Sequence, residues 1–203
     1  MEILQEPNNK INNPPRINMK HSRLFFLFAF LPVVGLSSSI AQFAGKQSEW
    51  RGFKKTVFKV GEHEAFVVEP EEPAKEAPWV WRARFPTYHT EIDEMLLRDG
   101  YHVAHINAGS RLGSPNALKI WKQFYDLLTE KHGLNKKLVL EGVSRGGLYV
   151  YRWAKAYPET VACIYNDTPV CDFKSWPGGK GAGKGAQGQW NRVIEEYGFK
   201  NEE

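Results

Sequence analysis

The sequence contains few residues of the types that build metal centres and disulfide frameworks. Only two cysteines, Cys163 and Cys171, occur among 203 residues, and there is no H-E-x-x-H or paired C-x-x-C spacing. Cys163 lies in an apolar run, so we expect a buried thiol, with a bridge to Cys171 as the alternative. We therefore predict no bound metal and no other cofactor.

The sequence also lacks a strong charge bias. The net charge is +4, and no compact stripe of lysine and arginine is present, which argues against a nucleic-acid partner. Hydrophobic residues make up 42% of the chain and aromatic residues 13%, enough for one domain with a packed core.

Residues 19–41 have the pattern of a secretory signal peptide. Lys20 and Arg23 precede an apolar run over residues 24–36, and small residues occupy the cleavage positions before Gln42. The run has about 13 residues, whereas a membrane-spanning helix needs about 20. We therefore expect export without later membrane contact, with an uncleaved anchor as the alternative. The expected organisation is a disordered extension (1–18), a signal peptide (19–41) and one domain (42–203).

Apolar periodicity predicts an α/β fold for this domain. A β-hairpin with its turn at residues 61–64 comes first, and strands then alternate with helices. Repeated crossovers predict a mainly parallel sheet with helices on both faces. The expected strands are 78–85, 101–109, 136–142 and 160–166, and the expected helices are 90–100, 114–133, 144–158 and 190–199.

The stretch "GVSRG", residues 142–146, fits the pattern G-x-S-x-G between a predicted strand and a predicted helix. This pattern places a serine, here Ser144, on a sharp turn with its hydroxyl above the sheet. Gly142 and Gly146 provide room where strand and helix cross, and the Arg145 N–H lies at the helix N-terminus. The alternative is a glycine-rich loop in which Ser144 only caps the helix.

With this motif, the chain resembles the α/β-hydrolase superfamily, in particular secreted esterase-like or prolyl-peptidase-like members, over about residues 56–197. The resemblance implies an acyl-serine mechanism on a small-molecule ester or peptide, with Ser144 as the nucleophile. It implies oxyanion donors from the Arg145 N–H and from the backbone of Ala83 or Arg84. The Arg84 side chain has two further interpretations. It contacts a substrate carboxylate, or it is an ordinary arginine at the surface or in an ion pair.

The remaining parts of a catalytic triad are harder to find. In this superfamily the order along the chain is serine, acid, histidine, but all six histidines here precede Ser144. Asp167 is the candidate acid, with a turn residue as the alternative reading. His89 and His105 are candidates for substrate contact or a surrogate base. Trp176 offers an aromatic surface beside the glycine-rich stretch 177–189.

We therefore expect an exported serine hydrolase of the esterase type that is truncated at its C-terminus and lacks its catalytic histidine. The alternative is a non-catalytic exported binding module, or an inactive relic, on the same framework. The stretch "GGKGAGK" superficially resembles a phosphate-binding loop, but no buried strand precedes it and glycine follows it. The sequence predicts no oligomeric state.

Overall fold

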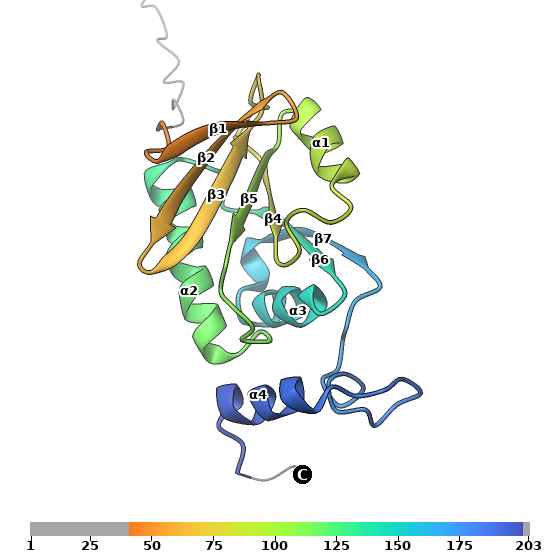
Figure 1. Ribbon diagram of the computed structural model, residues 1–203. Helices are drawn as coiled ribbons and strands as arrows, with labels where there is room; N and C mark the ends of the chain where they lie inside the picture. Colours follow the sequence, from red (N-terminus) through yellow and green to blue (C-terminus); the bar gives the residue numbers. More distant parts are fainter. Residues whose placement is uncertain (1–40, 201–203) are drawn as a thin grey trace, which may run out of the picture. The chain divides into compact units, whose positions relative to one another are not determined.

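The computed structural model describes residues 41–200 (Figure 1). The predicted extension and nearly all of the predicted signal peptide lie outside this range. Among residues 41–200, no helix combines the length and the apolar character needed to cross a bilayer.

The centre of the domain is one sheet of seven strands in the order β1-β2-β3-β5-β4-β6-β7 (Figure 1). In this order, the pairs β1-β2, β2-β3 and β3-β5 are antiparallel, and the pairs β5-β4, β4-β6 and β6-β7 are parallel. This confirms the predicted α/β class with an antiparallel opening. The strands are β1 (Lys46–Trp50), β2 (Phe53–Val60), β3 (His63–Glu69), β4 (Trp79–Arg82), β5 (His102–Ile106), β6 (Leu138–Val143) and β7 (Val161–Asp167).

Helices pack on both faces of this sheet, as the alternating pattern predicts. Helix α2 continues into a π-helical turn, η1, and a short 3₁₀ helix, η2, precedes β7. The helices are α1 (Glu91–Arg98), α2 (Pro115–Asp126), η1 (Leu127–Lys131), α3 (Gly146–Ala156), η2 (Pro158–Thr160) and α4 (Gln187–Tyr197).

The larger core lies between the sheet and the helices α2 and α3, and tryptophans dominate it. Trp81 of β4 lies with its ring centroid 3.9 Å from that of Trp121 and 5.0 Å from that of Trp153. All three side chains are almost fully buried. Truncating one such aromatic side chain costs about 3–5 kcal/mol in typical cores, so this cluster fixes β4 against α2 and α3.

Alternate residues of the same strands point to the opposite face, where α1 packs. Here the apolar cluster is small and contains Phe53, Val68, Leu97 and Val103. Arg82, at the end of β4, is buried on this face. A charged side chain is therefore a major part of the packing between α1 and the sheet.

Strand β7 forms an edge of the sheet and pairs only with β6 among the described residues. Ile164 and Tyr165 are 37% and 42% exposed. Cys163 is exposed and free, as is Cys171, so the prediction of a buried Cys163 was wrong. Its apolar neighbours lie on an edge strand that the described helices leave uncovered.

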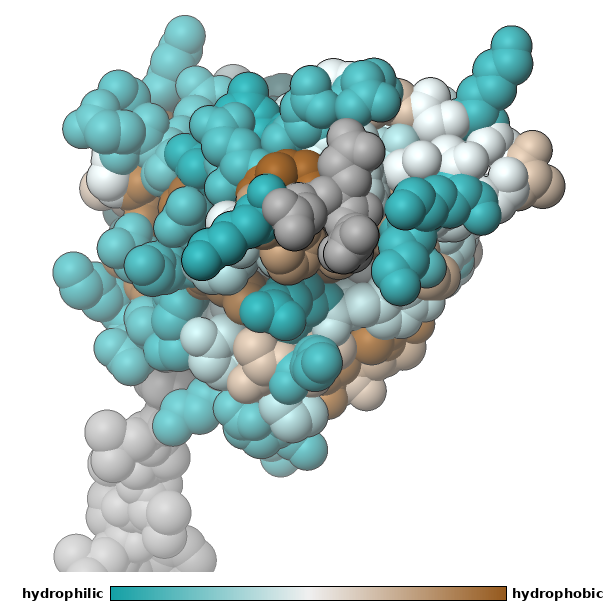
Figure 2. Space-filling model, turned by 90° about the horizontal axis from the view of Figure 1, so that it is seen from below, coloured by the Kyte–Doolittle hydropathy of each residue, from teal (hydrophilic) through white to brown (hydrophobic). Residues whose placement is uncertain are grey.

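The end of the molecule near α4 shows mostly hydrophilic residues with small separate hydrophobic areas (Figure 2).

Candidate active site

Ser144 lies on a sharp turn between β6 and α3 and is exposed. Its φ of 51° lies in the left-handed region, which a non-glycine residue adopts only where its surroundings enforce it. Three backbone hydrogen bonds provide this enforcement. The Ser144 N–H donates to the Asp167 carbonyl at 3.0 Å, and the Ser144 carbonyl accepts from the N–H groups of Val170 (2.8 Å) and Gly147 (3.1 Å).

The glycines around Ser144 allow strand, helix and the segment after β7 to approach closely. A Cβ added to Gly142 would lie 2.1 Å from Asn166 Oδ1, and one on Gly147 would lie 2.7 Å from Pro169 Cβ. Gly146 is less constrained, since its nearest neighbour would be Arg84 Cβ at 3.4 Å. The G-x-S-x-G pattern contains Gly142 and Gly146, but Gly147, which lies outside the pattern, is more tightly surrounded than Gly146.

A pocket of about 370 Å³ opens beside the Ser144 hydroxyl. Its walls come from the ends of neighbouring strands, where sites form in open α/β sheets. Tyr88 and Thr168 were not identified from the sequence, although each lies in a segment that follows a strand ending at this edge. The pocket is lined by Phe85, Tyr88, Val143, Ser144 and Thr168.

Two backbone N–H groups near Ser144 are suited to stabilise an oxyanion. The Arg145 N–H lies at the N-terminal end of α3, and the Arg84 backbone nitrogen lies 3.8 Å from the Cβ position of Gly146. Neither N–H donates a hydrogen bond within residues 41–200. Ala83 is excluded as a free donor, because its N–H donates to the Glu141 carbonyl at 2.9 Å. The hydrogen bonding between β4 and β6 thus continues one residue past Arg82, the last residue of β4.

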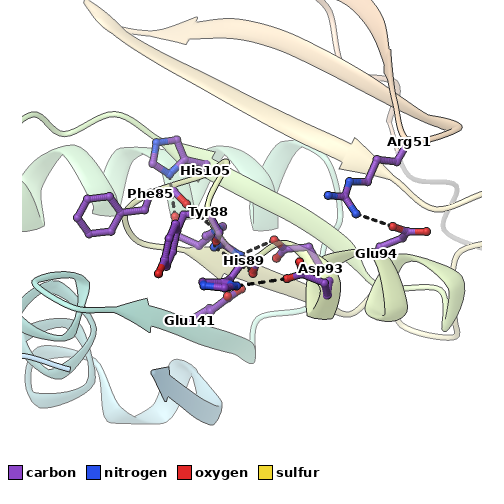
Figure 3. A network of polar contacts seen from close by, with 10 residues as sticks. Arg51, Phe85, Tyr88, His89, Asp93, Glu94, His105 and Glu141 are labelled. Carbon is purple, nitrogen blue, oxygen red and sulfur yellow. Dashed lines mark hydrogen bonds and ion pairs between the residues drawn. The ribbon is translucent and has the colours of Figure 1, made fainter. Parts of the chain in front are cut away.

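A buried arginine, Arg82, holds the loop that contains Phe85, Tyr88 and His89, and Figure 3 labels these three loop residues. Arg82 Nε donates to the Phe85 carbonyl at 3.1 Å, and its Nη2 atom donates to the Tyr88 carbonyl. Nη1 lies 3.4 Å from the His89 carbonyl. Phe85 and His89 both have positive φ, 53° and 49°. One guanidinium therefore fixes a loop whose backbone is otherwise unfavourable.

The same guanidinium contacts two buried carboxyl groups, from α1 and β6. Nη1 donates to Asp93 Oδ2 and, at 2.8 Å, to Glu141 Oε1 (Figure 3). Burial and the nearby Asp93 raise the pKa of Glu141 to about 8, and burial raises the pKa of Asp93 as well. At neutral pH Glu141 therefore holds a proton with which it can hydrogen-bond to Asp93. The buried network is then neutral overall.

This network also replaces an expected helix cap. Thr90 occupies the N-cap position of α1 but accepts no side-chain hydrogen bond there. Asp93, three positions after Thr90, pairs with Arg82 instead of with the backbone at the start of α1. The signal for this in the sequence is a charged residue inside each of two apolar strands, Arg82 and Glu141, since such residues must find a partner when buried.

Neither candidate histidine reaches Ser144 through a hydrogen bond. His105 is buried on the α1 face with Nδ1 2.8 Å from the Arg82 carbonyl, and burial lowers its pKa to about 4. His89 is exposed and lies against Tyr88, with 4.1 Å between ring centroids. Ser144 Oγ makes no hydrogen bond to any residue in the range 41–200.

Asp167 and Trp176 have different relationships to the pocket. Asp167 ends β7 next to the Ser144 turn, and its backbone carbonyl holds that turn. Trp176 packs against the main core and is not part of the pocket wall, because the segment 171–178 folds back toward α3 and α4. The substrate contact expected of Trp176 therefore has no support in the position of its side chain.

The comparisons with known proteins found similarity to solved structures alone. No family model and no curated protein matches the sequence. Among solved structures, the chain is similar to an acetyl xylan esterase from Aspergillus awamori, with 12% identity over 72% of this chain and a TM-score of 0.47. A dienelactone hydrolase from Anabaena variabilis has 20% identity over 58% of this chain and a TM-score of 0.44.

The acylaminoacyl peptidase from Pyrococcus horikoshii has 14% identity over 58% of this chain and a TM-score of 0.46. This chain spans 68% of the esterase, 63% of the dienelactone hydrolase and 23% of the peptidase. The sheet order, the antiparallel opening and the Ser144 turn give the chain an α/β-hydrolase-like fold in their own right.

Proposed function

We propose that this chain carries the nucleophile and the oxyanion site of a serine hydrolase that cleaves a small-molecule ester. The observation that supports this most directly is the exposed Ser144 at φ 51°, beside a pocket and two free N–H groups. A glycine would adopt this positive φ at a lower cost in free energy than a serine does. The strained backbone at Ser144 therefore gives no structural benefit of its own. An ester is favoured over a peptide by analogy alone. The signal-like pattern of residues 19–41 supports a location outside the cytoplasm for this activity.

In the proposed reaction, Ser144 Oγ attacks the ester carbonyl and the carbonyl oxygen takes up the negative charge. The N–H groups of Arg145 and Arg84 donate to this oxygen, and the alcohol leaves with a proton. Water then attacks the acyl-serine and releases the acid. A base must remove the proton from Ser144, and we infer that it comes from outside residues 41–200. Asp167 remains the candidate for the acid that orients such a base.

Acetylation by p-nitrophenyl acetate tests the nucleophile, because its activated leaving group makes the reaction measurable when only the buffer accepts the proton of Ser144. Peptide mass spectrometry compares the rate of acetylation at Ser144 with that at Ser110, another exposed serine. One oxyanion donor is worth roughly 10²–10³-fold in typical hydrolases, so we expect Ser144 to react faster than Ser110 by about that factor. Equal rates at the two serines would refute the proposed function.

A non-catalytic binding module is the second candidate. The observation in its favour is that Ser144 Oγ has no hydrogen-bond partner among the described residues. In this case the pocket binds its ligand with the Ser144 hydroxyl unmodified, and acetylation at Ser144 does not exceed that at Ser110. The same measurement therefore separates the two candidates.

A further inference from the structure

Two guanidinium groups lie beside the pocket that opens at Ser144. The Cζ atoms of Arg84 and Arg145 are 5.6 Å and 5.3 Å from the ring centroid of Phe85, which lines this pocket. The two arginines come from the loop after β4 and from the N-terminal end of α3. The fold thus brings two positive charges from different elements to the Phe85 ring, although neither arginine is itself among the residues that line the pocket.

Neither of these charges is neutralised by the described part of the chain. No carboxylate oxygen within residues 41–200 lies within 4.0 Å of Arg84 or Arg145. Arg84 Nη1 donates to the Gly109 carbonyl at 2.9 Å, and the Nε atoms of both arginines are buried without a partner. Arg82, by contrast, has two carboxyl partners on the other face of the sheet.

The surroundings of Arg84 disfavour its charge. Burial is the main cause that lowers the pKa of Arg84, and Arg145 lowers it further, while Tyr149 acts in the opposite direction. The acidic residues Glu141 and Asp167 do not balance the positive charge of the two arginines. Glu141 pairs with Arg82, and Asp167 forms no ion pair with either arginine. An anion in the pocket would relieve this unbalanced charge.

We propose that the pocket binds an ester that carries a carboxylate, with the carboxylate held by Arg84 and Arg145. The proposal rests on the proposed hydrolase function and adds the substrate class to it. Phe85, Tyr88 and Val143 provide an apolar wall for the body of the molecule, and the volume of about 370 Å³ suits a small ligand. A guanidinium binds a planar carboxylate through paired N–H groups, and the Arg145 Nε atom is buried with no hydrogen-bond partner within residues 41–200.

The test compares the binding of two probes that differ in one charge, 4-acetoxybenzoate and 4-acetoxybenzamide. Ligand-observed NMR measures both dissociation constants on the full chain carrying Ser144→Ala, which prevents turnover. A hydrogen bond to a charged group contributes more binding free energy than one to a neutral group. We therefore expect the benzoate to bind roughly 10-fold more tightly than the benzamide. Arg145→Gln should reduce this preference by at least about 3-fold, and Arg192→Gln, an exposed arginine on α4, should leave it unchanged.

Arg84 requires a second variant, because its side chain also holds the Gly109 carbonyl. Arg84→Lys keeps the charge and Arg84→Gln removes it, so the lysine variant should retain more of the preference. Thermal unfolding of each variant shows whether the fold is intact. Loss of affinity for both probes to the same degree would mean that the arginines only support the structure, and would overturn the proposal.

Two further outcomes separate this inference from the hydrolase function. Equal binding of benzoate and benzamide refutes the substrate class, whatever the acetylation of Ser144 shows. A clear preference for the benzoate, without faster acetylation of Ser144, supports the carboxylate site and refutes the hydrolase proposal. Displacement of the benzoate by an equal concentration of inorganic phosphate would identify a general anion site and would overturn the choice of a carboxylate ester.

Discussion

The backbone N–H of Ser144 donates to the carbonyl oxygen of Asp167 at 3.0 Å, so the last residue of β7 holds the turn at the end of β6. The carbonyl of Ser144 accepts in turn from the Val170 N–H. The exposed serine is thus held between its own helix and the segment that follows the neighbouring strand. Anything that separates β7 from β6 should also release the φ of 51° at Ser144.

Gly142→Ala should disrupt this arrangement. The new methyl group would lie 2.1 Å from Asn166 Oδ1, 3.0 Å from Val150 Cγ2 and 3.2 Å from the Gly147 backbone nitrogen, so the Asn166 side chain must move and the start of α3 must shift. Overpacking of this kind typically costs about 1–3 kcal/mol. Urea denaturation measures the loss. Gly188→Ala is the matched control, because nothing lies within 4 Å of its Cβ position, and alanine should stabilise α4 by up to about 1 kcal/mol.

Arg82→Leu should be strongly destabilising. It would leave Asp93 and Glu141 buried without their cation and would release the carbonyl groups of Phe85 and Tyr88. Breaking a buried pair from one side costs about 3–5 kcal/mol in typical proteins. Arg98→Gln, which removes an exposed pair with Glu94, should cost less than about 1 kcal/mol. Similar unfolding midpoints for the two variants in urea would contradict the role assigned to Arg82.

The stability of the chain should fall as the pH rises from about 6.5 to about 8, because below about 6.5 the lowered pKa of the buried His105 acts in the opposite direction. The folded state raises the pKa of Glu141 to about 8, so between its ordinary value and 8 the folded state binds a proton that the unfolded state has lost. Stability from this group is present at low pH and disappears as the pH rises through the folded pKa. Each unit of such a shift is worth about 1.4 kcal/mol.

Glu141→Gln mimics the protonated carboxyl group and should remove most of this pH dependence. Urea denaturation at pH 5, 6.5 and 8 measures the slope for the parent chain and for the variant. Glu49→Gln, on the exposed strand β1, serves as the control and should keep the slope of the parent chain. A slope unaltered in Glu141→Gln would show that Glu141 is ionised throughout this pH range.

Cys163 reports on whether the β7 edge is uncovered in solution. Because both thiols are exposed and free, a maleimide reagent should modify Cys163 in the folded chain at a rate within about 10-fold of that in urea. Single Cys163→Ser and Cys171→Ser variants assign the two reactions. Strong protection of Cys163 would mean that another chain or segment covers β7.

The sequence is sufficient to predict the parallel half of this fold because β4, β5 and β6 are buried and mostly apolar, and β7 has an equally apolar sequence. It does not reveal β1, since Lys46–Trp50 is an exposed edge strand without an apolar face. The same limitation explains Cys163, whose apolar neighbours in β7 look like those of a buried strand. Apolar runs show where the strands lie along the chain, but they do not show which strand lies at an edge of the sheet.

At the site, the sequence locates Ser144, Arg145 and Arg84 because each belongs to a local motif or directly follows a strand. It does not locate Tyr88 or Thr168, which reach the pocket through the conformation of their loops. We expected Ala83 as an oxyanion donor, but its N–H is already paired with the Glu141 carbonyl. The sequence does not show this pairing, because it does not give the hydrogen-bond register between β4 and β6. The pairing of Arg82 with Glu141 joins residues 59 positions apart, a separation beyond any local pattern.

The most direct test of the nucleophile is its reaction with a fluorophosphonate, followed by peptide mapping. Free imidazole is added as a substitute for the base that we infer to come from outside residues 41–200. We predict a single adduct on Ser144 that forms slowly alone, faster with imidazole, and not at all in Ser144→Ala. An adduct on another residue, or none on Ser144 at any imidazole concentration, would contradict the assignment of Ser144 as a nucleophile.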